Sequence, residues 1–361
     1  MKSVAKKTIF SIKPYIPGKP ISEVKRELGL KEVIKLASNE NPYPPSPKVL
    51  KAITQAAKEV NRYPDGDCFY LRSALAKRLK VNPRQLIFSN GSDELIVMAV
   101  RAFVDNGDEV IIAKPSFLIY EIASKIEGAN IKNIPLKDFS YDLDSMKKAV
   151  TKKTKIIFLG NPDNPSGTYL KDQDVAKFLR GLRKDILVFF DEAYYEYVDE
   201  KDYVDSLGLL KNYKNVIVTR TFSKMYGLAG LRIGYGIANL ELVDILNLIR
   251  EPFNVNSIAQ VAALACLNEN AYYKDIAKKV KDQREFLYKS FDRLGLEFKK
   301  SYTNFILINV KSDSTLVSQK LLKKGVIVRD MSSWGVKNFI RVSIGTQKEN
   351  KKFIKVLGEI L

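Results

Sequence analysis

Lys224 directly follows an apolar, strand-like run at residues 214–221, and other polar residues follow similar runs in the same way. The runs at 84–90, 154–161 and 185–192 also end in polar groups. The four ends together offer an amine, a carboxylate, a phenol, two amides and a Gly-Ser-Asp turn: Lys224, Asp191, Tyr194, Asn161, Asn164, Gly91, Ser92 and Asp93. Singly, such residues suit ordinary turns and helix caps. Together they indicate a site, because ligands bind beyond the carboxyl ends of parallel strands.

This set of side chains meets the needs of pyridoxal phosphate chemistry. A lysine amine forms a Schiff base with the cofactor aldehyde, and a carboxylate keeps the pyridine nitrogen protonated. Lys224 and Asp191 suit these roles, while Asn164 and Tyr194 suit hydrogen bonds to the ring 3-oxygen. The phosphate needs a helix N-terminus, hydroxyls and a cation, which are supplied by Ser92, Asp93, Thr221, Ser223 and Arg232. We therefore expect pyridoxal 5'-phosphate as the cofactor, with Lys224, Asp191 and Tyr194 as catalytic residues.

The elements that must position these residues alternate between strand-like and helix-like runs up to about residue 240. Strands are predicted at 84–90, 108–114, 154–161, 185–192 and 214–221. Their continuous apolar character is typical of a parallel sheet covered on both faces, which gives the α/β class. Long helical patterns and a few strands follow, such as 304–310 and 338–346. We expect an irregular N-terminal arm at 1–44, a large cofactor-binding domain at 45–245 and a small α+β domain at 246–361.

Composition restricts the remaining possibilities. The chain of 361 residues has no histidine, so acid–base work falls to lysine, carboxylate, tyrosine or a cofactor, and we expect no metal. Its two cysteines make no disulfide framework, and no apolar run is long enough to span a bilayer, which favours a cytoplasmic protein without a membrane partner. The net charge of +19 raises the alternative of a basic, nucleic-acid-binding α/β protein. The lysines are spread along the chain, however, and we expect no nucleic-acid partner.

The ordered motifs resemble a known family. They are "YIPGKP", "IKLASNENP", "RYPDGD", "NGSDELI", "NPDNPSGT", "DEAYYEY", "RTFSKMYGLAGLRIGYG", "VIVRD" and "IRVSIGT", and they run from residue 15 to residue 346. The chain is similar to the fold type I pyridoxal-phosphate aminotransferases, and within them it most resembles the histidinol-phosphate aminotransferases. The resemblance implies the PLP-dependent transferase (aspartate aminotransferase-like) fold, with a mostly parallel sheet in the large domain and a smaller α+β domain.

The resemblance also implies roles for residues outside the strand ends. Phe117 would stack on the cofactor ring, with Tyr120 as the second choice. Tyr63 would reach the cofactor phosphate of a neighbouring subunit, so a homodimer is implied, with the arm at the interface and against the small domain. The implied substrate-binding residues are Tyr15, Asn41, Arg329 and Arg341; Arg341 would clamp a carboxylate or phosphate, and Arg329 would help to hold a substrate phosphate.

The implied reaction is transamination of L-histidinol phosphate with 2-oxoglutarate, in histidine biosynthesis. Two other activities share these motifs, those of an aromatic amino-acid aminotransferase and of a threonine-phosphate decarboxylase. The chain departs from the pattern of this branch at one place, where Pro44 and Pro45 follow Tyr43 instead of a glycine. Proline lacks a backbone N–H donor, so we expect no substrate contact from a backbone amide at Pro44.

Overall fold

The computed structural model describes residues 2–14 and 16–361, and its largest element is a seven-stranded sheet. In spatial order the strands are β2 (Leu86–Ser89), β8 (Gly234–Ala238), β7 (Val216–Thr221), β6 (Leu187–Asp191), β5 (Thr154–Gly160), β3 (Glu109–Lys114) and β4 (Asn130–Pro135). Neighbouring strands from β7 to β4 are parallel, whereas β8 is antiparallel to both β2 and β7. The predicted α/β class with a mostly parallel sheet is confirmed.

Both faces of this sheet are buried, as the apolar runs predicted. Phe189 packs in one hydrophobic cluster and its neighbour Phe190 in the other. Successive side chains of a strand point to opposite faces, so a strand between two helix layers must be apolar at every position. The cluster that contains Phe189 also receives side chains of α4, α5 and α9, and that of Phe190 receives side chains of α3, α6, α7 and α10.

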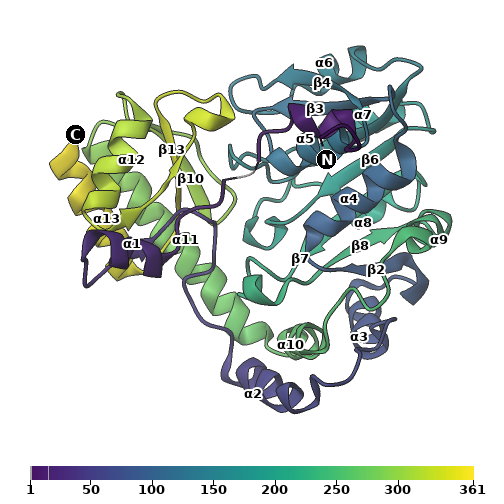
Figure 1. Cartoon of the computed structure of the whole chain (residues 1–361), viewed down its shortest axis with the longest axis horizontal. Helices are drawn as coiled ribbons and strands as arrows, with labels where there is room; N and C mark the ends of the chain where they lie inside the picture. The colour runs from purple at the N-terminus through teal and green to yellow at the C-terminus, as the bar shows by residue number, and fades with distance from the viewer. Residues whose placement is uncertain (1, 15) are drawn as a thin grey trace.

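Some of the helices cover the large sheet, and others belong to a second, smaller lobe (Figure 1). In chain order they are η1 (Lys7–Ser11), α1 (Ile21–Leu28), α2 (Pro47–Ala56), η2 (Ala57–Glu59), α3 (Phe69–Leu79), η3 (Pro83–Gln85), α4 (Ser92–Phe103), α5 (Leu118–Ile126), α6 (Leu143–Lys148), α7 (Asp172–Arg180), η4 (Tyr195–Tyr197), α8 (Ser206–Leu209), η5 (Ala229–Leu231), α9 (Leu240–Ile249), α10 (Ser257–Leu267), α11 (Asn270–Arg293), α12 (Ser314–Lys323), η6 (Ser332–Trp334) and α13 (Gln347–Ile360).

The smaller lobe contains a four-stranded antiparallel sheet beside α11, α12 and α13. Its strands, in spatial order, are β12 (Arg329–Asp330), β13 (Phe339–Ser343), β10 (Phe305–Asn309) and β9 (Glu297–Phe298). In Figure 1, α11 runs from beside α10 up into this lobe and so connects the two parts. The predicted boundary at residue 245 falls inside α9, and α10 packs against α2 and α3, so the limits of the domains stay a prediction.

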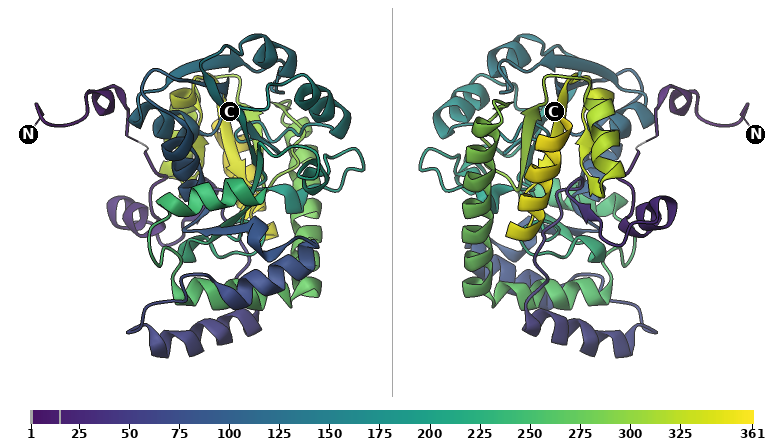
Figure 2. Two further views of the ribbon diagram at one scale, coloured as in Figure 1. Left: turned by 90° about the vertical axis from the view of Figure 1, so that its right-hand side faces the viewer. Right: turned by 90° about the vertical axis from the view of Figure 1, so that its left-hand side faces the viewer.

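The N-terminal arm is more regular than we expected. It contains α1, and β1 (Ile34–Lys35) pairs in parallel with β11 (Val326–Ile327) of the smaller lobe. Val24 of α1 is fully buried in a small cluster with Ile327. Gly29 ends α1 in the left-handed conformation, with a φ of 64°, so glycine stops the helix at no steric cost. Figure 2 shows α1 and η1 on the outside of the molecule.

Two strands of the large sheet were not predicted, β4 and β8. β4 is an edge strand with no fully buried residue, so it lacks the apolar pattern of the others. β8 contains two glycines because its neighbours leave no room for side chains. A Cβ at Gly234 would lie 2.6 Å from the backbone N of Ser92 and 2.9 Å from the backbone C of Gly91. Gly234 thus lets β8 approach the turn that starts α4.

No helix within the described residues is both long and apolar enough to cross a membrane.

Replacing Gly234 with alanine should destabilise the protein by roughly 1–3 kcal/mol, the usual cost of forcing extra volume into a packed interior. The added Cβ would press on backbone atoms of Gly91 and Ser92, which cannot rotate away. Gly230→Ala is the matched control, because a Cβ there meets nothing within 4 Å, and it should change the stability by less than about 0.5 kcal/mol. Urea unfolding measures both variants. Equal midpoints for the two would contradict this account.

Candidate active site

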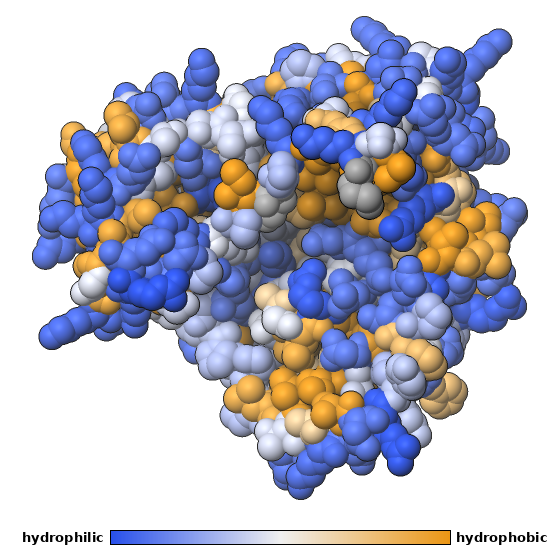
Figure 3. Space-filling model, in the orientation of Figure 1, coloured by the Kyte–Doolittle hydropathy of each residue, from blue (hydrophilic) through white to orange (hydrophobic). Residues whose placement is uncertain are grey.

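A cavity of about 330 Å³ lies beyond the carboxyl ends of β5, β6 and β7, where the smaller lobe approaches the large sheet. Its lining includes most of the residues that the sequence singled out: Ser92, Asp93, Phe117, Tyr120, Asn164, Asp191, Tyr194, Thr221, Ser223, Lys224, Arg232 and Arg341. Figure 3 shows that the face turned to the viewer is hollowed between the two lobes. The residues predicted from the strand ends therefore do come together in space.

Lys224 lies just after β7 and contributes the amine of the cavity. Burial lowers the pKa of this lysine to about 8; the nearby Asp93 opposes that shift, and the positive charge of Arg341 adds to it. Its Nζ lies 5.8 Å from the centre of the Tyr194 ring. With a pKa of about 8, roughly a tenth of the amine is uncharged at pH 7 and able to react as a nucleophile, far more than for an exposed lysine.

Asp191 ends β6 and places its carboxylate at the floor of the cavity. Tyr120 donates its hydroxyl hydrogen to Oδ2 over 2.7 Å, and the backbone N–H of Ala193 donates to Oδ1 over 3.1 Å. Burial raises the pKa of Asp191 to about 6, and the two donors oppose this shift. The carboxylate is thus ionised at neutral pH, fixed in orientation and able to accept a further hydrogen bond from a cationic nitrogen.

Phe117 and Tyr120 both line the cavity, but they are placed differently. Tyr120 is buried between the sheet and α5, where its ring stacks on Phe158 at a centroid distance of 4.5 Å. Its hydroxyl is already committed to Asp191. Phe117 lies at the start of α5, with its ring edge-on to Tyr120 at 5.6 Å. Phe117 is therefore the better candidate for stacking on a cofactor ring, as the resemblance implied, and Tyr120 fixes the carboxylate.

Asn164 lies in the loop that follows β5, and buried polar groups hold this loop in shape. Asp163 accepts hydrogen bonds from the backbone N–H and hydroxyl of Ser166 and from the hydroxyl of Tyr141. Asn161, the other amide of the predicted pair, accepts from the backbone N–H of Leu170 over 2.7 Å and does not line the cavity. Asn161 thus holds the loop, whereas Asn164 faces the cavity.

The end of the cavity near α4 is suited to an anion. The backbone N–H groups of Ser92 and Asp93 start α4 and no side chain caps them, and Arg232 lies 3.5 Å from the Asp93 carboxylate. Gly91 is required here, because its φ is 81° and a Cβ would lie 2.3 Å from an Nη atom of Arg232. Arg232 itself has a φ of 56°, which is uncommon for a residue with a side chain and marks functional sites. Thr221 and Ser223 line the same cavity from the end of β7.

Arg341 enters the cavity from β13 of the smaller lobe and is 4% exposed. It donates hydrogen bonds to the side-chain oxygen of Asn164 and, over 3.2 Å, to the carbonyl of Ala37. Its guanidinium also lies over the rings of Phe305 and Trp334, at 5.1 and 5.6 Å. These contacts hold the guanidinium of Arg341 at the wall of the cavity, where a cation can bind an anionic ligand.

The other predicted site residues lie outside this cavity. Tyr63 is 83% exposed and stacks on Phe253 at 4.8 Å. Asn41 donates to the carbonyl of Met225 and lines a neighbouring groove. Arg329 donates to the carbonyl of Ile16 and lines a second cavity of about 860 Å³, which shares Trp334 with the first. Tyr15 lies outside the described residues. The carbonyl of Pro44 accepts a hydrogen bond from Tyr272.

Sequence reasoning missed several groups that complete the site. Asn39 and Trp334 line the cavity; Asn39 lies in the motif "SNENP", and Trp334 is the single tryptophan of the chain. Behind the cavity, Arg220 of β7 and Glu192 form a buried ion pair at 2.8 Å. This pair fixes the turn after Asp191 to the strand that leads to Lys224. Its partners are 28 residues apart, and no spacing rule links them.

The residues that line this cavity fit pyridoxal phosphate as a bound cofactor. The chemistry of the donor set matches each part of that molecule: an amine of lowered pKa for the aldehyde, a carboxylate for the pyridine nitrogen, Asn164 and Tyr194 for the 3-oxygen, and the start of α4 with Arg232 for the phosphate. The described residues contain no cluster of three or more Cys, Asp or Glu side chains that could hold a metal ion.

Comparison with known proteins agrees with this geometry. Residues 31–357 match the family model of aminotransferase class I and II. The histidinol-phosphate aminotransferase of Caldicellulosiruptor saccharolyticus is 46% identical over 356 residues, which are 99% of each chain. The solved histidinol-phosphate aminotransferase of Sinorhizobium meliloti, in complex with pyridoxal-5'-phosphate, has a TM-score of 0.91 at 28% identity and covers 99% of this chain and 97% of its own.

A structure with a different printed activity is also similar. The L-threonine-O-3-phosphate decarboxylase of Porphyromonas gingivalis has a TM-score of 0.80 at 25% identity and covers 91% of this chain and 99% of its own. The predicted aspartate aminotransferase-like fold is confirmed by these likenesses. From the family match over most of its length and the relative that is 46% identical, the chain belongs to the aminotransferase class I and II family.

Proposed function

We propose that this aminotransferase uses pyridoxal 5'-phosphate to transfer the amino group of L-histidinol phosphate to 2-oxoglutarate. The products are imidazole-acetol phosphate and L-glutamate, in a step of histidine biosynthesis. The observation that carries the proposal is the convergence of Lys224, Asp191 and the anion-binding start of α4 in one cavity. The similarity to histidinol-phosphate aminotransferases over nearly the whole chain supports the choice of substrate.

The cofactor, when bound, supplies an electron sink for the charge left on the substrate carbon when its proton is removed. Lys224 would hold the cofactor through its amine and would take the proton from the substrate Cα. Burial lowers the pKa of Lys224 and so favours the neutral amine that a base requires. Asp191 would hold the pyridine nitrogen, and Asn164 and Tyr194 would bind the 3-oxygen. The phosphate group would be held by Ser92, Asp93, Thr221, Ser223 and Arg232.

Two arginines are placed to bind the anionic groups of the substrates. Arg341 lies in the cavity with Lys224, where it can hold a carboxylate or a phosphate. Arg329 lies in the adjoining cavity, which also receives Lys114 and Lys125 from the large lobe. Trp334 lines both cavities, and in the proposed complex a substrate whose amine lies at Lys224 extends its phosphate toward Arg329. Asn41 and Tyr15 complete the proposed set of substrate-binding residues.

An exposed aromatic surface supports the further proposal of a homodimer. Val60, Tyr63, Phe69, Tyr70 and Phe253 are each between 46% and 83% exposed. Contiguous exposed apolar groups of this kind mark interaction surfaces. In a homodimer, Tyr63 of one subunit would reach the cofactor phosphate of the other. We place the enzyme in the cytoplasm, with small molecules as its only other partners.

Two alternative activities use the same cofactor site. An aromatic amino-acid aminotransferase would leave Arg329 without a phosphate to bind, and a threonine-phosphate decarboxylase would release carbon dioxide. The similarity to the L-threonine-O-3-phosphate decarboxylase favours the second over the first. Half-reactions of the purified enzyme with histidinol phosphate, phenylalanine, tyrosine and threonine phosphate separate all three activities. Conversion of the cofactor absorption band by phenylalanine alone would contradict the proposed substrate.

Lys224→Ala should abolish both transamination and the absorption band of the lysine-attached cofactor. The variant lacks the amine that attaches the cofactor and moves the substrate proton. Lys214→Ala, in the exposed turn before the same strand, is the matched control and should keep the band and the activity. Absorption spectra and turnover with histidinol phosphate measure the outcome. A Lys224→Ala enzyme that turned over at the rate of the wild type would refute the mechanism.

The rate of cofactor uptake by the apoenzyme should rise with pH and become constant above about pH 8, where the lowered pKa of Lys224 lies. The sign follows from the reacting form: only the neutral amine attacks an aldehyde, and a lysine is neutral above its pKa. Stopped-flow absorbance with pyridoxal phosphate measures the rate. A rate that continued to rise to pH 10, as for an exposed lysine, would contradict the buried amine.

Arg329→Met should raise KM for histidinol phosphate about 10- to 100-fold, the value of one hydrogen bond to a charged group. Phenylalanine has no phosphate, so any half-reaction with it should change less than about twofold. Arg101→Met, on the exposed surface of α4, controls for the loss of one positive charge. Steady-state kinetics with histidinol phosphate measure KM. An unchanged KM would remove Arg329 from the substrate site.

A further inference from the structure

Asn39 is a buried polar residue of the cavity that no role described above explains. It is 2% exposed and lies in the segment that passes from β1 of the smaller lobe to α2 of the large one. Its φ of 55° is left-handed, a conformation that asparagine tolerates better than most residues. A strained, buried polar residue at a site indicates a defined task.

The smaller lobe fixes the position of Asn39 through three hydrogen bonds. The backbone N–H of Asn39 donates to the hydroxyl oxygen of Ser343 over 2.8 Å. The same hydroxyl donates to Oδ1 of Asn39 over 3.3 Å. Asn304 donates its side-chain N–H to the backbone carbonyl of Asn39 over 2.9 Å. Because a hydroxyl donor faces Oδ1, the other end of the side chain must be the NH₂ group, and it points away from Ser343.

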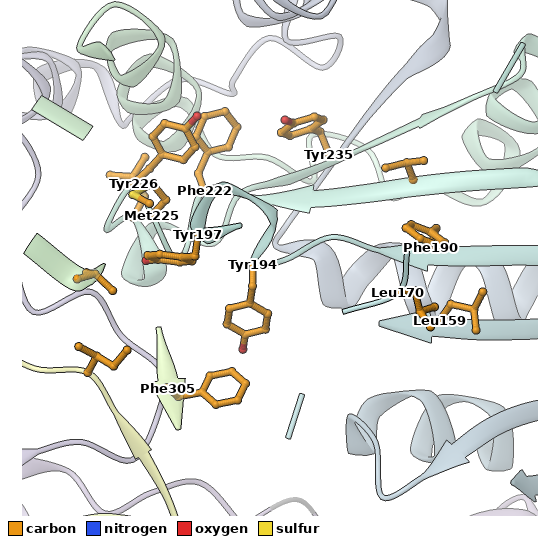
Figure 4. Close-up of a cluster of buried hydrophobic side chains, with 14 of the residues drawn as sticks. Leu159, Leu170, Phe190, Tyr194, Tyr197, Phe222, Met225, Tyr226, Tyr235 and Phe305 are labelled. Carbon is orange, nitrogen blue, oxygen red and sulfur yellow. The ribbon is translucent and has the colours of Figure 1, made fainter. Parts of the chain in front are cut away.

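That NH₂ group reaches the large lobe, where it donates to the hydroxyl oxygen of Tyr194 over 3.0 Å. The ring of Tyr194 cannot turn aside, since it packs edge-on against Phe305 at a centroid distance of 5.2 Å. Figure 4 shows Tyr194 reaching from the large lobe toward Phe305. Within the described chain Asn39 is the single hydrogen-bond partner of this hydroxyl, and Tyr194 lines the cavity of Lys224.

A phenol oxygen has one hydrogen to donate and can accept hydrogen bonds on the side away from it. We propose that Asn39 is a positioning residue: its NH₂ group occupies the accepting side of the Tyr194 hydroxyl and so leaves the phenol hydrogen for an acceptor in the cavity. This inference rests on the proposed function, in which the acceptor is the 3-oxygen of the cofactor. It adds that the smaller lobe, through Ser343 and Asn304, sets the direction of that hydrogen bond.

Asn39→Asp tests the direction of the hydrogen bond with little change of shape, and aspartate also tolerates a left-handed φ. A carboxylate can only accept, so the phenol hydrogen turns toward the new carboxylate and is withdrawn from the cofactor. The bound cofactor then loses a donor to its 3-oxygen, and the pH at which its absorption band changes should rise by roughly one unit. Asn39→Gly, which keeps the backbone conformation without a charge, should produce a smaller shift of the same sign.

A double-mutant cycle with Tyr194→Phe separates an effect through the phenol from a direct effect of the new charge. The shift caused by Asn39→Asp should vanish in the Tyr194→Phe background. Ser343→Ala removes the hydroxyl that holds Oδ1 of Asn39, so the amide is less firmly oriented, and a smaller shift of the same sign is expected. The proposal is overturned if Asn39→Asp leaves the band unchanged, or if its shift persists without the phenol.

A measurement without cofactor tells failure of this inference from failure of the proposed function. Apoprotein labelled with ¹³C at tyrosine Cζ gives one resonance that disappears in Tyr194→Phe. Asn39→Asp should move that resonance and raise the pKa of the phenol, because a phenol that donates to a carboxylate holds its proton more firmly. A wild-type protein that takes up no pyridoxal phosphate would refute the proposed function alone. An unmoved Tyr194 resonance in Asn39→Asp would refute the role of Asn39.

Discussion

Burial of the Lys224 amine is the constraint on which the rest of the site depends. Removing the amine from water disfavours its charged form and lowers its pKa to about 8, and Arg341 and Arg232 act in the same direction. Burial also raises the pKa of Asp191 to about 6. Hydrogen bonds from the Tyr120 hydroxyl and the Ala193 backbone N–H oppose this rise. The two opposite shifts leave an ionised carboxylate and a partly neutral amine together at pH 7, which is the pair that the proposed chemistry requires.

The two lobes contribute unequally to this arrangement. The large sheet delivers Lys224 and Asp191 from neighbouring parallel strands, β7 and β6, so their positions follow from the hydrogen-bonded register of those strands. The smaller lobe contributes through alternate residues of β13, Arg341 and Ser343, which lie on one face of that strand. Arg341 contacts Asn164 directly, and Ser343 contacts Tyr194 through Asn39. The groups proposed for the 3-oxygen are therefore both held from the smaller lobe.

The parallel strands of the large sheet and the cofactor-site residues at their ends could be predicted from the sequence. The buried strands are apolar at every position, and the polar residues that follow them lie at one edge of the sheet. The strands that lead to Asn164, Asp191 and Lys224 were predicted to within two residues. β8 was missed because strand propensity disfavours glycine. Gly234 is needed there for close packing of β8 on Ser92, and a propensity scale carries no information on such tertiary contacts. The hydrogen bond between Tyr194 and Asn39 joins residues 155 positions apart. Such contacts depend on how the lobes pack, and sequence spacing carries no sign of them.

The most direct measurement identifies the lysine that the cofactor attaches to. Borohydride reduction of the enzyme loaded with pyridoxal phosphate makes the attachment permanent, and peptide mapping by mass spectrometry then locates it. The account predicts that the added mass lies on the peptide that contains Lys224. The loss of visible absorption should be proportional to the amount of labelled peptide. A label on a different lysine, or a protein that carries no label after reduction, would contradict the central claim.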